Sequence, residues 1–475
     1  MKKTISGVLL TLTAAFALFA CGKKERKRNG KPNQINFYCW NDEFKTRLNK
    51  FYGIKSENGS TTTLNNGIII QWTMATNEGS VYQDTLDIAL DNNMVDMYCF
   101  EADYATKYVK SEFAIEMEKL GILGDMKNQY KYTQDIVTNA DGKVVGSSWQ
   151  ATPGIIVYNY NVAKAVWGDT VTTDAVEDKL STWDKFQAAA AEVKAKGKYT
   201  LIGYACWYRT YGNNLSAQMY DAKKKTITVD KALFDYAKDT RAFADAGYIC
   251  GTDDDYGLWQ GEWGKEMGKD NCLCIYSCPW YTDFCLTGNR KPVYAAHTDA
   301  PEGEQTAKER EELGYAYAED SGLRLAAGYK TWFWGGTWLT ATPVSQQEET
   351  IKGEVANIIK KMTTDKATLL SISKTYSDFT NDKGAMTDLA ADASAKNGYF
   401  GGQNCYAYYA AAVEKCDLSK ASDYDQQITE GFQAAFVKYI RGSQDAAKCW
   451  DEFKTELTKK TSISKINYAA NDLVK

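Results

Sequence analysis

Short apolar runs alternate with helical segments along most of this chain. GIIIQW at 67–72, DMYCF at 96–100 and GIIVYN at 154–159 lack polar alternation, which predicts strands that are covered on both faces. TWDKFQAAAAEVKAKG at 182–197 predicts a helix with a threonine cap at its start and a glycine stop at its end. Such alternation is typical of α/β units with mostly parallel sheets, and 475 residues are enough for two lobes.

Charge and histidine content exclude several classes of function. The chain has 56 Lys and Arg against 61 Asp and Glu, a net charge of −5, whereas a nucleic-acid-binding protein would show a basic surplus. Its single histidine, His297, excludes any site that needs two histidine ligands from one chain. Cys272, Cys274 and Cys278 form no C-x-x-C pair, so we expect buried free thiols, no metal and no cofactor.

The N-terminus reads as a bacterial export signal. Two lysines precede an apolar stretch at 7–20, which is too short to span a bilayer as a helix. The sequence LFAC that ends at Cys21 resembles a lipoprotein signal box, so we expect residues 1–20 to be removed and Cys21 to carry lipid; cleavage nearby without lipid is the alternative. Residues 21–34 hold six basic residues and one acid, which predicts an unfolded tether that lies against anionic headgroups.

Four further segments come in a distinctive order. They are INFYCWNDEF at 35–44, DMYCFEADYATKYV at 96–109, SSWQATPGIIVYNYNVAKAVWG at 147–168 and TWFWGGTWLTATPVSQQEE at 331–349. Their order and spacing resemble the extracellular solute-binding proteins of sugar ABC transporters, the group that includes maltose-binding protein. The parallels cover most of residues 35–445.

This resemblance implies a two-lobed periplasmic-binding-protein-like fold with a cleft between the lobes that closes by a hinge. The N-lobe would comprise 35–150 and 323–366, the C-lobe 153–302 and 372–475, and 303–322 would be a surface excursion and a crossing. The implied function is that of a monomeric, lipid-anchored carbohydrate-binding protein, with an oligosaccharide as ligand and an ABC permease as partner. It would be extracytoplasmic and not an enzyme.

Two other functions stay open. An exported glycoside hydrolase would need two carboxyl groups on either side of the scissile bond, and a chain with 61 acidic residues always offers candidates. A receptor that presents ligand to a surface sensor would have the same fold and pocket. Released sugar would identify the hydrolase, and the receptor would be identified by its partner.

A sugar presents apolar C–H faces and a rim of hydroxyl groups, so its site needs flat aromatic rings and polar groups with paired hydrogen-bonding atoms. We looked for both at the expected carboxyl ends of strands, where α/β sheets bind ligands. Core packing is the alternative for Trp40 and Trp207, and a solvated helix start is the alternative for Asp103. The candidates are Trp40, Asn41, Asp42, Asp103, Gln150, Trp207, Arg209, Trp280, Trp334 and Trp338.

Overall fold

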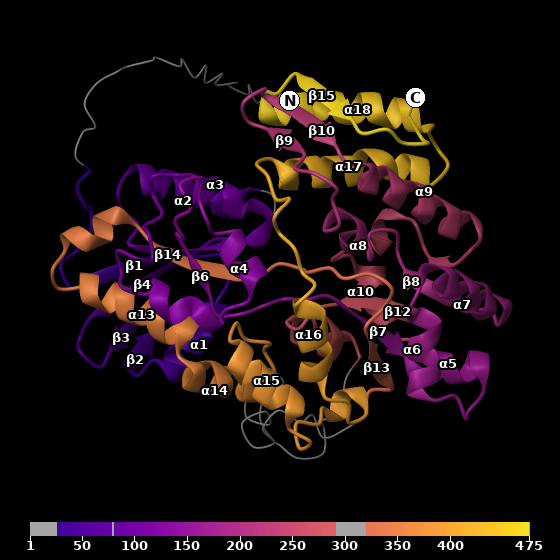
Figure 1. The fold of residues 1–475 in the computed structure, drawn as a ribbon, viewed down its shortest axis with the longest axis horizontal. Helices are drawn as coiled ribbons and strands as arrows, with labels where there is room; N and C mark the ends of the chain where they lie inside the picture. The colour runs from indigo at the N-terminus through magenta and orange to yellow at the C-terminus, as the bar shows by residue number, and fades with distance from the viewer. Residues whose placement is uncertain (1–25, 78–79, 291–319, 475) are drawn as a thin grey trace, which may run out of the picture.

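The computed structural model describes residues 26–77, 80–290 and 320–474. The predicted signal peptide, Cys21, His297 and most of the predicted excursion at 303–322 lie outside the described residues. Within them, two bodies with separate sheets lie side by side (Figure 1). The predicted two-lobed α/β fold is confirmed.

The first lobe is built on a seven-stranded sheet. Its strand order is β2 (Ile54–Asn58), β3 (Thr61–Leu64), β4 (Ile69–Met74), β1 (Gln34–Cys39), β5 (Met97–Glu101), β14 (Thr337–Ala341) and β6 (Ser147–Ser148). Strand β1 pairs in parallel with β4 and β5, and the remaining pairs are antiparallel. The helices of this lobe are α1 (Glu43–Phe51), α2 (Val81–Asp91), α3 (Ala105–Val109), α4 (Lys131–Asp135), α13 (Lys352–Thr364) and α14 (Lys366–Tyr376).

The second lobe is built on a five-stranded sheet. Its order is β11 (Ile249–Cys250), β8 (Tyr199–Ile202), β12 (Cys272–Ser277), β7 (Ile155–Asn159) and β13 (Leu323–Ala326). Strands β11, β8 and β12 are parallel, while β7 is antiparallel to both of its neighbours. The sheets are therefore mixed rather than mostly parallel. Strands β14 and β7, which enter from the other lobe, run against their neighbours, and so does β3, which comes from a hairpin within the first lobe.

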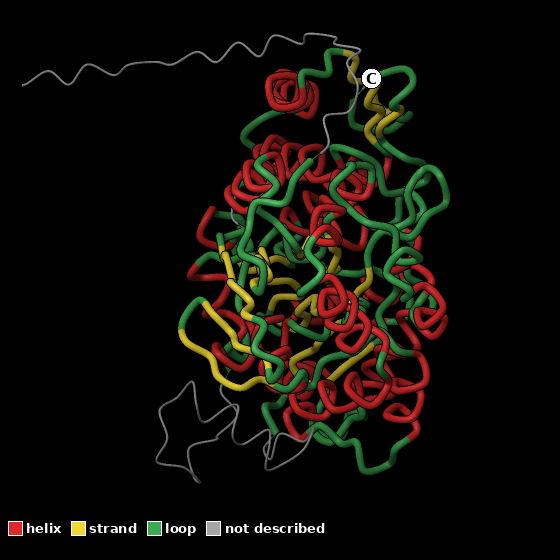
Figure 2. Tube along the Cα trace, turned by 90° about the vertical axis from the view of Figure 1, so that its left-hand side faces the viewer, coloured by secondary structure: helices red, strands yellow, loops and turns green. Residues whose placement is uncertain are grey.

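A small sheet of β15 (Lys465–Tyr468), β10 (Thr226–Val229) and β9 (Tyr220–Asp221) lies beside the C-terminus at one end of the molecule (Figures 1 and 2). Helices α9, α17 and α18 pack next to it (Figure 1). The remaining helices are α5 (Tyr160–Trp167), α6 (Thr173–Leu180), α7 (Trp183–Ala195), α8 (Arg209–Gly212), α9 (Lys231–Asp245), α10 (Gly261–Met267), α11 (Thr287–Asn289), α15 (Lys383–Ala391), α16 (Cys405–Val413), α17 (Asp425–Ile440) and α18 (Ala446–Thr461). Short helical turns are η1 (Ala102–Tyr104), η2 (Leu123–Asn128), η3 (Asp254–Tyr256), η4 (Thr282–Leu286), η5 (Pro343–Gln347) and η6 (Gly398–Phe400).

Strand β5 shows why the apolar runs lack polar alternation. Met97 and Cys99 face the core beneath α13 and α14, whereas Tyr98 and Phe100 face a second core that continues into the other lobe. All four side chains are buried. Both faces of the sheet are thus covered, as the sequence predicted.

Three crossing segments join the lobes, and they pair with one another. The amide of Ala151 donates to the carbonyl of Phe379 at 2.9 Å, and the amide of Trp334 donates to the carbonyl of Thr152 at 3.0 Å. Gly154 lies beneath the Trp332 ring, where an added Cβ would be 2.0 Å from a ring carbon, so only glycine fits. The first crossing therefore lies at the centre of a three-stranded hinge.

The structure moves two of the expected lobe boundaries. β13 belongs to the second sheet, although the sequence analysis placed 323–366 in the first lobe, so the middle crossing lies at 327–336. The apolar residues of the LRLA run in β13 pair with β7 at the edge of the second sheet, so the chain leaves the second lobe only after this strand. Helix α14 still packs on α1 of the first lobe, so the last crossing follows it at 377–381 rather than at 366–372.

Residues 26–33 pack against the first lobe, although the sequence predicted an unfolded tether for 21–34. The Arg28 guanidinium donates to both carboxylate oxygens of Asp96, at 2.6 and 2.8 Å. The two side chains are only 6% and 1% exposed. Arg26 lies over the Phe113 ring and pairs with Glu112 at the surface. The acidic partners lie far along the sequence, so local composition could not reveal this docking.

Among the described residues, the structure contains no helix of the length and apolarity needed to cross a membrane.

Arg28→Met should lower the free energy of unfolding by about 3–5 kcal/mol, because it leaves the buried Asp96 carboxylate without its cation. Arg26→Met is the matched control, and it should cost no more than about 1 kcal/mol because its partner Glu112 is exposed. Urea unfolding of both variants measures the difference. Equal stability of the two would contradict the docking of this segment.

Candidate functional site

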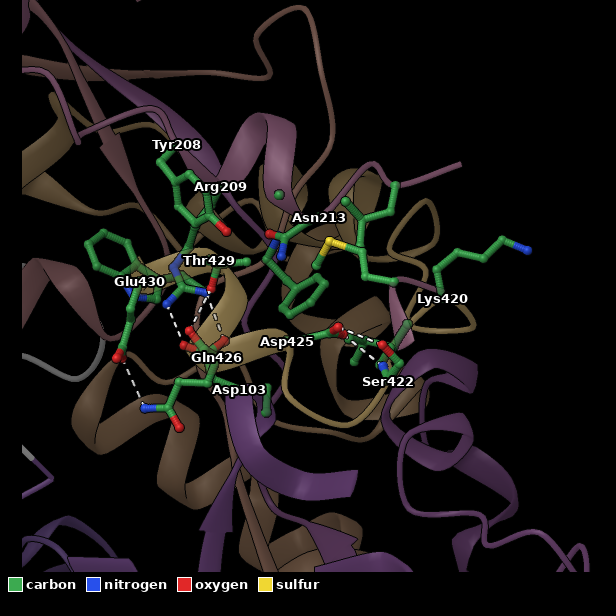
Figure 3. A pocket seen from close by; sticks show the side chains of 18 of the residues that line it. Asp103, Tyr208, Arg209, Asn213, Lys420, Ser422, Asp425, Gln426, Thr429 and Glu430 are labelled. Carbon is green, nitrogen blue, oxygen red and sulfur yellow. Dashed lines mark hydrogen bonds and ion pairs between the residues drawn. The ribbon is translucent and has the colours of Figure 1, made fainter. Parts of the chain in front are cut away.

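A pocket of about 290 Å³ lies where the two lobes meet (Figure 3). One wall is the first-lobe turn η1, which follows the carboxyl end of β5 and packs against α17. The other walls come from α8 and the loop after it, the hinge strand at 333–334, the loop at 258–259 and the start of α17. Polar lining residues are Asp103, Thr106, Tyr208, Arg209, Asn213, Asp417, Lys420, Ser422, Asp425, Gln426, Thr429, Glu430 and Gln433.

An ion pair joins the lobes across this pocket. Asp103 on η1 accepts two hydrogen bonds from Arg209 at the start of α8, at 3.1 and 2.8 Å. The Arg209 guanidinium also lies 5.2 Å from the centre of the Trp334 ring. This bidentate geometry fixes both side chains and leaves their outer edges facing the pocket. The structure thus brings together three of the residues that the sequence analysis selected.

The first two turns of α17 contribute acids and amides. Asp425 accepts hydrogen bonds from the backbone amide and the hydroxyl of Ser422, at 2.7 and 2.6 Å. Gln426 donates to Glu430 at 3.0 Å and accepts from Gln83 of the first lobe at 3.1 Å. Burial raises the pKa of Asp425 to about 7, and the charge of Asp103 adds to that rise. Burial also raises the pKa of Glu430.

Aromatic rings form another part of the lining. Trp259 and Trp334 line the pocket, whereas the predicted residue Trp280 lies outside the lining and packs against both. The Trp259 and Trp280 rings are stacked at 6.2 Å and an angle of 16°. The Trp280 indole N–H donates to the carbonyl of Trp334 at 2.9 Å. Trp259 is 59% exposed and has a φ of 70°, a conformation that costs free energy for a bulky side chain. An exposed aromatic face is thus held in place at the pocket.

Glu101 ends β5, two residues before Asp103. Burial raises the pKa of its carboxyl well above the usual range, and the neighbouring Asp103 raises it further. A Cβ added at Gly335 would lie 3.3 Å from Glu101 Oε1 and 3.5 Å from the Trp280 indole nitrogen. The hinge glycine therefore lets the backbone approach both side chains.

Three other predicted residues lie at the start of α1, outside the pocket lining. Trp40 is half-buried against Tyr82, with ring centres 5.6 Å apart. The Asn41 side chain accepts a hydrogen bond from the amide of Glu43, and the Asp42 carbonyl accepts from Thr46. These contacts begin the helix.

Gln150 is buried in the hinge, and its amide donates to Glu43 at 3.4 Å. Burial raises the pKa of Glu43, although the nearby Arg47 opposes the rise. Arg47 in turn pairs with Asp378 through two hydrogen bonds of 3.0 Å. Gln150 thus belongs to a polar group beside the hinge and does not line the pocket.

Two predicted ligand residues, Trp207 and Trp338, are core residues instead. The strand before Trp207, β8, ends at Ile202 and so does not reach that residue, because Gly203 turns the chain with a φ of 70°. Trp207 then points into the second-lobe core and donates to Thr240 at 2.9 Å.

Trp338 was expected on the same side as Trp334, on the assumption of a continuous extended segment. Gly335 and Gly336 both have positive φ, 66° and 109°, and they break that period. Trp338 is fully buried, stacks on Phe100 and donates to the carbonyl of Thr133 at 2.8 Å. The two tryptophans therefore face different surroundings.

Sequence reasoning missed Trp259 and the polar residues of α17. Trp259 lies in a loop without periodicity, and its only signal is the local density of aromatic residues in DYGLWQGEW at 255–263. Residues 428–440 read as an apolar stripe, so the acids that precede and interrupt this stripe were assigned no role. Their function depends on the first lobe, which lies next to them only in the fold.

One group of side chains has the spacing of metal ligands. The ligand atoms of Cys250, Glu266 and Cys272 lie within 4.8 Å of one another, and all three residues are buried. The Glu266 carboxylate accepts from Lys269 and from Asn271, and Asn271 also donates to Cys250 at 3.5 Å. These hydrogen bonds satisfy the group without an ion. The eleven cysteines in the described part of the chain are all free thiols.

No protein-family model and no curated protein sequence matches this chain. Solved structures do match. An extracellular solute-binding protein of family 1 shares 15% identity at a TM-score of 0.66, over 90% of this chain and 99% of that chain. The sugar-binding protein MalE from Xanthomonas citri shares 11% identity at a TM-score of 0.63, over 90% and 98% of the two chains.

A third match is the ABC-transporter-associated binding protein from B. animalis subsp. lactis, solved in complex with β-1,6-galactobiose. It shares 16% identity at a TM-score of 0.61, over 92% of this chain and all of that chain. At these identities the shared feature is the fold. The chain therefore has the fold of the extracellular solute-binding proteins, and the matched structures are binding proteins rather than enzymes.

The raised pKa of Asp425 predicts a pH dependence of stability. Between pH 4 and pH 7 the folded chain keeps a proton that the unfolded chain has lost, so the free energy of unfolding falls as pH rises. Asp425→Asn should remove roughly 2 kcal/mol of this fall, about half of what the full shift would give, because the carboxyl keeps some contact with water.

Urea unfolding at a series of pH values measures this slope, and Glu456→Gln, an exposed acid on α18, is the control. If the free energy of unfolding depends on pH in the same way for Asp425→Asn as for the parent, the result would contradict the burial of this carboxyl.

Proposed function

We propose that this chain binds a carbohydrate between its lobes and delivers it to an ABC permease. One observation carries the proposal: the pocket at the lobe junction combines an exposed indole face with fixed charged groups. Trp259 offers a surface for the C–H face of a sugar ring. Asp103 and Arg209 offer hydrogen bonds to its hydroxyl groups, each worth about 1.5–3 kcal/mol.

The pocket volume indicates a short ligand. About 290 Å³ is at the lower end of the range of roughly 300–1,000 Å³ that small-molecule sites span. We therefore propose a ligand of one or two sugar rings, which is shorter than the oligosaccharide expected from the sequence or at the lower limit of that class. The β-1,6-galactobiose bound by one structural neighbour is a ligand of this size.

The geometry offers less to a glycoside hydrolase. Such an enzyme needs one carboxyl that donates a proton and a second that stays charged on the other face of the ring. Asp103 is tied to Arg209 by two hydrogen bonds, and Asp425 and Glu430 both come from α17. Asp103, the lining acid that comes from the first lobe, is thus committed to Arg209, which favours the binding function.

The proposal includes a lipid anchor at Cys21, which rests on the sequence. Arg26 is the first residue with described contacts, five residues after Cys21. Five residues span at most about 18 Å. An acylated Cys21 would therefore hold the first lobe close to the membrane that carries the permease.

A thermal-shift screen over neutral disaccharides tests the binding function. We expect a rise in melting temperature without release of monosaccharide. Trp259→Ala should weaken binding of the best ligand about tenfold and change stability by less than about 0.5 kcal/mol, because this side chain is exposed. Trp207→Ala, at a buried site, should instead cost about 3–5 kcal/mol of stability.

If Trp259→Ala binds the sugar as tightly as the parent does, this ring is not part of the site. Release of monosaccharide would show that the protein hydrolyses its ligand rather than only binding it.

Cys21→Ser tests the anchor. In cells fed a fatty acid that carries a chemical handle, the parent should take up label and sediment with membranes, and the variant should do neither. Equal labelling of the two proteins would rule out lipid attachment at Cys21. Cys416→Ser, which alters a half-buried thiol far along the chain, is the control.

A further inference from the structure

We propose that the interlobe pocket selects a carbohydrate that carries a basic nitrogen, that is, a protonated amino sugar, over its neutral counterpart. This inference rests on the proposed function and adds the chemical class of the ligand. It follows from the balance of charge around the pocket and from the aromatic faces opposite.

The charged side chains that line the pocket do not balance. Four are acidic and two are basic. Of the basic ones, Arg209 is already held by both oxygens of Asp103, at 3.1 and 2.8 Å. The other basic residue, Lys420, follows Ser419, whose backbone amide and hydroxyl both donate to the carboxylate of Asp417. These hydrogen bonds lower the pKa of Asp417, and the charge of Lys420 lowers it further. The basic charges are thus matched by two of the four acids.

The other two acids are Asp425 and Glu430, and within the described ranges of the chain neither forms an ion pair with a lysine or an arginine. The more distant charges of Lys460 and Arg209 act on Glu430 without contacting it closely, and its pKa stays raised by burial. Their hydrogen-bond donors are the neutral groups of Ser422 and of Gln426. A carboxylate can accept about four hydrogen bonds, so each keeps acceptor sites for a ligand. In the view of Figure 3, Asp103 appears between these two acids.

The negative charge is also concentrated. Burial raises the pKa values of Glu101, Asp425 and Glu430, and the charge of Asp103 raises all three further. A ligand ammonium would relieve this repulsion, whereas a hydroxyl would not. A carboxylate on the ligand would increase it, so acidic sugars are disfavoured.

The aromatic side of the pocket suits a cation as well. Arg209 already lies 5.2 Å from the centre of the Trp334 ring, which is within range of a cation–π contact. Trp259 is 59% exposed and stacked on Trp280, so its outer face is open to a second cation. A protonated amine would therefore meet acids on α17 and an indole on the facing wall.

Matched ligand pairs test this inference. Cellobiose and the β-1,4-linked disaccharide of glucosamine differ in the exchange of a hydroxyl for an ammonium on each ring, as do glucose and glucosamine. Calorimetric titration near neutral pH should show the amine binding about tenfold more tightly or better in at least one pair, with the preference falling as salt is added. Glu430→Gln and Asp425→Asn keep the shape of each side chain, and each should reduce the preference several-fold. Glu456→Gln on α18 should leave it unchanged.

Each outcome is decisive. Neutral sugars that bind as tightly as their amines would overturn the inference and leave the proposed function intact. An amine preference that both pocket variants retain would also overturn it, because the cation would then bind elsewhere. Failure of all four sugars to bind would overturn the preference as well, and the disaccharide screen would then decide on the proposed function separately.

Discussion

The pairing of three crossing segments in the hinge determines where everything else lies. Residues 149–154 hydrogen-bond to both of the other crossings, and the Trp332 ring fills the space that a side chain at Gly154 would need. This small ladder sets the position of β5 in one lobe relative to α8 and α17 in the other. The pocket exists because the carboxyl end of β5 then faces the start of α17.

Electrostatics at that junction act on both stability and recognition. Asp103 and Arg209 bridge the lobes, so the position of both side chains depends on the angle between the lobes. A ligand that contacts either side chain therefore depends on that angle as well. Burial of the acids around this pair raises their pKa values, which costs free energy in the empty protein. A ligand with complementary donors would recover part of that cost on binding, which links closure of the lobes to the chemistry of the ligand.

Much of the fold was predictable because burial on both faces leaves a direct trace in the sequence. The runs that become β4, β5 and β7 were placed within a few residues of their observed bounds. Asp103, Arg209 and Trp334, which were selected because each lies near a strand end or in the hinge, do line one pocket, and their role as ligand residues stays a prediction. Trp207 and Trp338 were misplaced because glycines with positive φ interrupt the extended chain, and such angles leave no periodic signal. Arg28, Asp425 and Glu430 owe their roles to partners far away in the sequence.

The most direct test of this account is a crystal structure of the protein with its tightest-binding sugar. The account predicts a sugar ring between the Trp259 side chain and the wall formed by Asp103 and α17, with the Asp103–Arg209 pair in contact with ring hydroxyls. A ligand bound outside this junction, or a junction closed by side chains with no ring inside it, would contradict the account.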